Sequence, residues 1–104
     1  MYEMTTLRLT LSKAPFEVMA TGEKKIEYRR QSAWIESRLF DKKHQVRSYQ
    51  YVEFVNGYGA DKPRFTAEFK GVYMADQVNE TFSNGLRVVC TEPTYCIQLG
   101  NIVF

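Results

Sequence analysis

Hydrophobic and polar residues alternate along several short stretches of the chain, a pattern typical of β-strands with one buried face. The clearest stretch is residues 7–13, where three leucines alternate with polar side chains, and residues 65–72 repeat the pattern. Residues 49–59 predict another strand with apolar side chains on both faces, which indicates that it is covered on both sides. This strand ends at Asn56 and Gly57, a pair that favours a tight turn.

Two short helices are predicted in the N-terminal half. Pro15 is tolerated in the first turn of a helix over residues 14–21. Gly22 then ends this helix, because glycine adopts left-handed backbone conformations at low cost. Ser32 is placed to cap a second helix over residues 33–40.

The second predicted helix carries both apolar and cationic side chains. Ile35 and Leu39 lie one turn apart, so we expect both in the hydrophobic core. Trp34 and Arg38 are also one turn apart. We expect the Trp34 ring to be buried as well, with Arg38 beside its edge.

The C-terminal half adds further strands. Residues 86–90 and 95–104 each predict a strand, whereas residues 73–85 have no clear pattern and predict either a short helix or a long loop. Strand, helix, strand, helix and then several strands favour an α+β fold. We expect one domain over residues 1–104, a small β-barrel of about five to six strands with two short helices at its rim.

Residues 24–30, with the sequence KKIEYRR, predict the strand that carries most of the candidate chemistry. Ile26 and Tyr28 share one face of this strand, and charged side chains share the other. The charged face consists of Lys25, Glu27 and Arg29. If Ile26 and Tyr28 face the core, this charged face is either exposed, with its charges compensating one another, or it lines a cleft.

Charge is unevenly distributed along the chain. The net charge of the whole chain is only +2. Residues 24–47 hold eight lysines and arginines against three acidic residues, a net charge of +5, so the remaining residues carry −3. A basic segment of this kind predicts a face for an anionic partner such as nucleic acid, although a charged surface that binds nothing has the same composition.

Composition and the first residues of the chain indicate the kind of protein and its location. Hydrophobic residues make up 44% and charged residues 25% of the chain, which is ordinary for a soluble globular protein. No apolar run approaches the roughly 20 residues that a membrane-spanning helix needs. The first residues, MYEMTTLRLTLSK, lack the pattern of a signal peptide. We therefore predict a cytoplasmic protein without membrane association.

Several kinds of catalytic and cofactor site are absent from the sequence. It contains no glycine-rich phosphate loop, no H-E-x-x-H motif and no G-x-S-x-G motif. Cys90 and Cys96 are the only cysteines and His44 is the only histidine, too few ligands for a zinc site, so we predict no metal and no cofactor. We expect the two cysteines to be buried reduced thiols, and a disulfide or redox pair is the alternative. Lysine, arginine and carboxylate chemistry remains, and Lys24, Glu27 and Arg29 are its candidates.

Longer motifs resemble a known family. The segments GEKKIEYRR, WIESRLF, YVEFVNGYG and CIQLGNIV together resemble an ASCH domain, in particular the short single-domain group found in bacteria and their phages. The hallmark of this family is G-x-K-x-x-E-x-R, and the chain matches it at Gly22, Lys24, Glu27 and Arg29. The N-G-Y-G turn at residues 56–59 is a second match. The resemblance covers nearly the whole chain and is weakest over residues 73–94.

The resemblance implies a PUA-like β-barrel with a cleft between the barrel and the first helix, lined by the hallmark residues. ASCH domains are thought to bind RNA or nucleotide-like ligands. The side chains we expect to contact such a ligand are Lys24, Lys25, Glu27, Arg29, Arg30, Trp34, Arg38, Asn56 and Tyr58. The cations would contact phosphate or a base edge, Glu27 would orient Arg29 or accept from a base amino group, and Tyr58 could stack on a base.

Two alternatives remain open. The first is a metal-independent hydrolase of RNA or of a modified nucleoside, with Lys24 and Glu27 as base and acid, because a lysine with a depressed pKa can act as a base or nucleophile. The deacylases of the family place a threonine three residues after the hallmark lysine, and Glu27 occupies that position here. The second alternative is a module that binds another protein.

Overall fold

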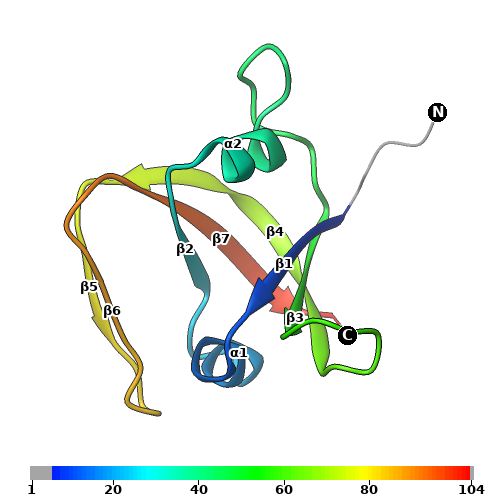
Figure 1. Ribbon diagram of the computed structural model, residues 1–104, viewed down its shortest axis with the longest axis vertical. Helices are drawn as coiled ribbons and strands as arrows, with labels where there is room; N and C mark the ends of the chain where they lie inside the picture. The colour runs from blue at the N-terminus through cyan, green and yellow to red at the C-terminus, as the bar shows by residue number, and fades with distance from the viewer. Residues whose placement is uncertain (1–5, 104) are drawn as a thin grey trace.

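The computed structural model describes residues 6–103 as a small α+β fold, built on a curled five-stranded sheet that forms a half-barrel (Figure 1). In spatial order, the sheet contains β1 (Thr6–Leu11), β3 (Tyr51–Asn56), β4 (Arg64–Ala75), β7 (Thr94–Ile102) and β2 (Ile26–Arg30). Two helices, α1 (Lys13–Ala20) and α2 (Ala33–Leu39), precede and follow β2. A second sheet consists of β5 (Val78–Thr81) and β6 (Arg87–Cys90).

The topology places the N-terminal strands at opposite edges of the sheet. β1 pairs in parallel with β3, and the connection between them contains α1, β2 and α2. The remaining neighbours in the sheet are antiparallel. The register between β4 and β7 shifts between Ala67 and Gly71, and such irregularities bend a strand and increase its twist. This bend helps to curl the sheet, so that its two edges, β1 and β2, come near each other.

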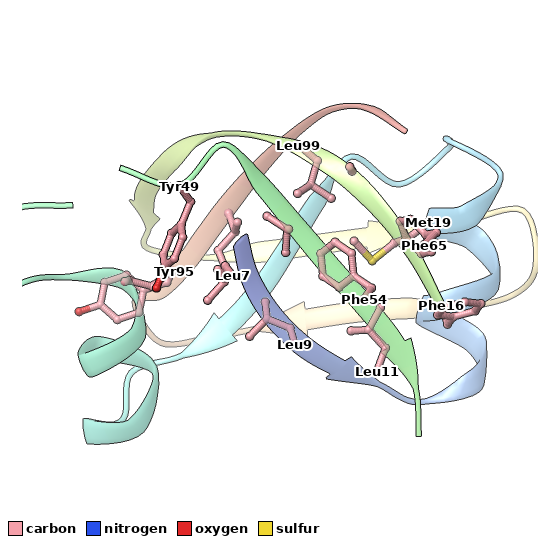
Figure 2. Packing of buried hydrophobic residues seen from close by; sticks show 14 of the residues in the cluster. Leu7, Leu9, Leu11, Phe16, Met19, Tyr49, Phe54, Phe65, Tyr95 and Leu99 are labelled. Atoms are coloured by element: carbon pink, nitrogen blue, oxygen red, sulfur yellow. The ribbon is translucent and has the colours of Figure 1, made fainter. Parts of the chain in front are cut away.

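The hydrophobic core fills the inside of the curled sheet (Figure 2). The three leucines of β1 are buried, as the alternation over residues 7–13 predicts. Phe54 of β3 lies with its ring centroid 5.3 Å from that of Phe65, and Phe65 lies 5.2 Å from Phe16 of α1. Ile35 and Leu39 of α2 join the same cluster, which confirms the prediction for both.

Two predictions about α2 and the C-terminal half are wrong. Trp34 is 48% exposed, because Ile35 and Leu39 occupy the buried face of α2 and Trp34 lies beside that face. Residues 73–85 form neither a helix nor a long loop. β4 continues to Ala75, and the chain then turns into the hairpin of β5 and β6.

A hydrogen bond between Tyr95 and Glu36 ties α2 to β7 and gives a pH-dependent prediction. The Tyr95 hydroxyl donates to Glu36 Oε2 at 2.6 Å. This bond, burial and the Glu36 charge raise the pKa of Tyr95 to about 12. In the unfolded chain tyrosine ionises near pH 10, so the unfolded state loses this proton first and the stability due to Tyr95 is lost as the pH rises from about 10 to 12.

We therefore expect Tyr95→Phe to flatten the alkaline fall in stability. At pH 7 the variant should be less stable by about 1.5–3 kcal/mol, because it lacks a hydrogen bond to a charged group. The free energy of unfolding, measured in urea from pH 7 to 12, tests both effects. Tyr58→Phe is the control, since Tyr58 is 86% exposed. Equal alkaline slopes in the wild type and Tyr95→Phe would contradict the role of this hydroxyl.

Candidate ligand-binding cleft

A cleft of about 340 Å³ opens between β1, α1, β2 and the β5–β6 hairpin. Small-molecule sites usually have volumes of about 300–1,000 Å³, so the cleft can hold a ligand of modest size. It is lined by Thr10, Leu11, Ser12, Pro15, Lys24, Glu27, Tyr28, Arg29 and Val88. Lys24, Glu27 and Arg29, the candidates from the sequence, are therefore all in its wall.

The link between α1 and β2 sets the position of Lys24. α1 ends at Ala20, and Gly22 follows with a φ of 86°, the left-handed conformation predicted for a helix stop. The backbone N–H of Lys24 donates to Val18 O at 3.4 Å, which turns the chain back beneath the helix. The side chain of Lys24 consequently points to Met19 and not to solvent, and only 2% of its surface is exposed.

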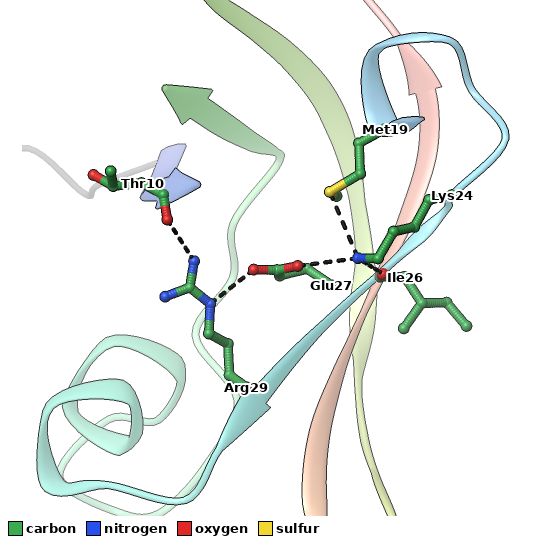
Figure 3. Close-up of polar contacts among 6 residues, drawn as sticks. All are labelled: Thr10, Met19, Lys24, Ile26, Glu27 and Arg29. Atoms are coloured by element: carbon green, nitrogen blue, oxygen red, sulfur yellow. Dashed lines mark hydrogen bonds and ion pairs between the residues drawn. The ribbon is translucent and has the colours of Figure 1, made fainter. Parts of the chain in front are cut away.

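Glu27 joins two cations in a buried chain of charges (Figure 3). Lys24 Nζ lies 3.1 Å from Glu27 Oε1, and Arg29 Nε lies 2.8 Å from Glu27 Oε2. Arg29 Nη2 also donates to the backbone oxygen of Thr10 on β1 at 2.9 Å. No strand pairing joins β1 to β2 within residues 6–103, so this guanidinium bridges the open side of the half-barrel.

The ammonium of Lys24 is fully engaged inside the protein. Besides Glu27, it donates to Ile26 O at 2.5 Å and lies 3.7 Å from Met19 Sδ. An ammonium has only three N–H donors, so none is left for a ligand. Burial lowers the pKa of Lys24, and the charge of Glu27 opposes that effect. In this arrangement Lys24 holds Glu27 in place.

Glu27 and Arg29 retain the capacity to bind a ligand. Each carboxylate oxygen of Glu27 has two acceptor positions and uses one of them for its cation. The Nη1 group of Arg29 has no partner among residues 6–103. The cleft therefore offers an anionic acceptor beside a cationic donor, and the ring of Tyr28 lies in the same wall, 5.1 Å from Lys24 Nζ.

The condition considered for the second strand, that Ile26 and Tyr28 face the core, does not hold, although Glu27 and Arg29 do line a cleft. Glu27 pairs with Ile97 and Arg29 with Tyr95, and these two β7 residues belong to the core cluster. Directly opposed residues of antiparallel strands point to the same face, so the charged side chains lie on the inner side of the sheet. Ile26 and Tyr28 are half-buried and belong to the other face. The inner face tolerates these charges because Lys24 and Arg29 neutralise Glu27.

The β5–β6 hairpin forms a wall of the cleft that the sequence analysis missed. Val88 lines the cleft, and the tip of the hairpin is fixed to the α1 region. Glu23 accepts hydrogen bonds from the backbone N–H and the hydroxyl of Ser83, and Asn84 Nδ2 donates to Ala14 O at 3.0 Å. The signal was present, because Asn84 is followed by a glycine between two apolar stretches, a strong indication of a hairpin.

The other predicted contact residues lie outside this cleft. They are Lys25, Arg30, Trp34, Arg38, Asn56 and Tyr58. Trp34 and Arg38 line a separate groove, and Lys25 lines a third, smaller hollow. Tyr58 is 86% exposed in the turn after β3. This turn nevertheless lies beside the cleft, since the N–H of Gly57 donates to Leu11 O at 3.1 Å.

The described part of the chain contains neither a disulfide nor a cluster of side chains suited to a metal ion. Cys90 and Cys96 are both free thiols. Within residues 6–103, no three His, Cys, Asp or Glu side chains are placed to hold a metal ion. Neither helix in that range has the length and apolar character needed to cross a membrane.

Comparisons with protein-family models, with curated proteins and with solved structures found no match. The function is therefore inferred from the residues and geometry of the cleft.

Proposed function

We propose that this protein is a PUA-like domain of the ASCH type that binds RNA or a nucleotide-like ligand in the Lys24–Glu27–Arg29 cleft. The observation that carries the proposal is the buried carboxylate of Glu27, held between two cations in the wall of a ligand-sized cleft. Burying charges costs free energy that apolar residues in their place would avoid. A binding role gives a reason for keeping these charges, and all three residues are hallmark positions of the family that the sequence resembles.

The exposed chemistry of the cleft suits a nucleobase joined to a phosphate. Glu27 accepts a hydrogen bond from a base amino group, as carboxylates do from cytosine. Arg29 presents its free Nη1 to a base carbonyl or to a phosphate, for which guanidinium groups are well suited. The Tyr28 ring supplies a surface for stacking, an interaction worth about 1–3 kcal/mol per base.

Replacing Arg29 with glutamine tests the proposal. Arg29→Gln removes the ligand-facing donor, and we expect the affinity for nucleoside monophosphates to fall at least about tenfold, the loss of one charge-assisted hydrogen bond. Isothermal titration calorimetry with the four ribonucleoside monophosphates measures this directly. Raising the salt concentration should weaken binding if the ligand phosphate is contacted.

Arg64→Gln is the matched control. Arg64 also pairs with a glutamate, Glu53, at 3.7 Å, but it lies on β4 and does not line the cleft. Both variants lose one positive charge, so a general electrostatic effect would weaken binding equally in the two. A folded Arg29→Gln protein that binds like the wild type, or a wild type that binds none of the four nucleotides and no short RNA, would overturn the proposal.

The hydrolase alternative has one supporting observation, the lowered pKa of Lys24. The geometry favours binding over this alternative. All three N–H donors of Lys24 are engaged by Met19, Ile26 and Glu27, and the side chain is 2% exposed. A general base needs hydrogen-bond access to the proton that it removes, and Lys24 has none in this arrangement.

A further inference from the structure

Two hollows lie along the same edge strand, β1. Thr10 and Leu11, at its C-terminal end, and Ser12 directly after it line the cleft described above. Thr6, Leu7 and Arg8, at its N-terminal end, line a second groove of about 220 Å³, which Trp34, Arg38 and Tyr49 complete. Helices α1 and α2 lie at the two ends of this side of the half-barrel (Figure 1). The second groove was not expected from the sequence.

Trp34 is the most informative residue of the second groove. Its side chain is the only tryptophan of the chain and is 48% exposed, although Ile35 and Leu39 already supply the core contacts of α2. The Arg38 guanidinium lies over its ring, with Cζ 5.2 Å from the centroid. An exposed aromatic ring beside an arginine is the combination that single-stranded nucleic-acid sites use for stacking and phosphate contact.

Neighbouring side chains hold the C-terminal turn of α2, which carries Arg38. The Tyr49 hydroxyl donates to Arg38 O at 2.6 Å, and Arg47 Nε donates to Ser37 O at 3.2 Å, so two side chains fix the C-terminal turn of α2. Arg8 contributes a second cation, paired with Glu53 at 3.3 Å and 67% exposed. The lining of the groove includes two arginines and no carboxylate, and with Glu53 beside Arg8 the groove keeps a net positive charge from Arg38. This charge is complementary to a phosphodiester strand.

The two hollows adjoin along β1, where the lining residues Arg8 and Thr10 are two positions apart. A strand rises about 3.3 Å per residue, so Arg8 and Leu11 of β1 lie about 10 Å apart. An extended dinucleotide can span that distance. The Arg29 guanidinium, bonded to Thr10 O, lies at the boundary and carries positive charge between the cleft and the groove.

We propose that the Trp34–Arg38 groove is a second subsite for single-stranded nucleic acid, in which the nucleotide next to the one held in the cleft stacks on Trp34. This inference rests on the proposed function, since it extends the ligand of the cleft from a nucleotide to a strand. Trp34 supplies the stacking surface, and Arg8 and Arg38 contact the connecting phosphates. A mononucleotide occupies only the cleft.

The test compares mononucleotides with mixed-sequence hexanucleotides, made as RNA and as DNA. We expect the wild type to bind a hexanucleotide at least about tenfold more tightly than a mononucleotide, and only the hexanucleotide to quench Trp34 fluorescence. Trp34→Ala should remove most of that gain, because stacking is worth about 1–3 kcal/mol, and should leave mononucleotide affinity unchanged.

Arg8→Gln should lower the salt dependence of hexanucleotide binding by about 0.7 in logarithmic slope. Tyr73→Ala, which removes a similarly exposed ring on β4, outside both the cleft and the groove, is the control.

The outcomes separate the two proposals. If mononucleotides bind in the cleft but Trp34→Ala leaves hexanucleotide affinity unchanged, the second subsite is overturned and the proposed function stands. If neither mononucleotides nor hexanucleotides bind, both proposals are overturned. If hexanucleotides quench Trp34 in the wild type and calorimetry shows the expected effects of Trp34→Ala and Arg8→Gln on hexanucleotide binding, the subsite is supported with either sugar. The RNA and DNA arms then assign the strand. Thermal unfolding of each variant verifies that it is folded.

Discussion

Glu27→Ala is expected to lower the free energy of unfolding by about 3–5 kcal/mol, the usual cost of breaking a buried ion pair. The variant leaves the ammonium of Lys24, 2% exposed, without its anionic partner. The loss of Glu27 costs less free energy at Arg29, since its side chain is 24% exposed and keeps its hydrogen bond to Thr10 O. Urea denaturation at pH 7 measures the loss.

The pH dependence of the same variant identifies Lys24 as the cause. Burial lowers the pKa of Lys24 below that of an unfolded lysine, about 10.4. Between these two values the unfolded state binds more protons, so the contribution of Lys24 makes stability rise with pH across that window. Without Glu27 the folded pKa falls further. The rise should therefore begin at a lower pH in Glu27→Ala than in the wild type.

A double variant distinguishes an unpaired charge from a simple loss of packing. Lys24→Met combined with Glu27→Leu removes both charges, and we expect it to recover most of the lost stability, because apolar replacements of buried ion pairs are often neutral or stabilising. Glu17→Ala is the control, since its pair with Lys13 at 3.9 Å is exposed and worth about 0–1 kcal/mol. A Glu27→Ala protein as stable as Glu17→Ala would show that the buried pair contributes little.

Local patterns predicted the elements that depend on neighbouring residues. Alternation predicted β1, and the glycine after α1 has the left-handed conformation expected of a helix stop. Ser32 accepts from the N–H of Ile35 at 3.1 Å, the capping contact expected at the start of α2. In each case the decisive interactions lie within a few residues of one another.

The direction in which β2 faces could not be predicted in this way. Alternation shows that Ile26 and Tyr28 share a face, but it does not show which face meets the core. That choice depends on the register with β7, where Glu27 lies opposite Ile97. It also depends on Lys24, whose side chain reaches Glu27 from outside the strand. The assumption that apolar side chains face inward fails here, because the inward-facing carboxylate of Glu27 is paired with Lys24 and Arg29.

The predicted contact residues are divided between the cleft and the Trp34–Arg38 groove, and this division could not be predicted from local patterns either. Trp34 and Arg38 are near the hallmark in sequence, and this proximity suggested a single site. Trp34 and Arg38 nevertheless line a different hollow from the hallmark residues. They lie on α2, and β2 carries the chain from α1, at one end of the half-barrel, to α2 at the other (Figure 1). Sequence proximity therefore grouped the residues of both hollows into one predicted site.

Phe54→Ala should destabilise the protein by about 3–5 kcal/mol, the range for truncating a buried phenylalanine. Phe54 is fully buried at the centre of β3, and its ring contacts Phe65, which in turn contacts Phe16 of α1. The cavity left by the ring therefore weakens the packing that holds α1 against the sheet. Chemical denaturation measures the change in the free energy of unfolding.

The same cavity should weaken ligand binding, because α1 forms one wall of the cleft through Pro15. Phe54→Leu fills most of the space, so it should cost less stability than Phe54→Ala and leave the affinity of the cleft near that of the wild type. Tyr58→Ala, at an exposed site after the same strand, should change stability by less than about 0.5 kcal/mol. If Phe54→Ala cost no more than Tyr58→Ala, the aromatic contacts between β3, β4 and α1 would not be what positions the cleft.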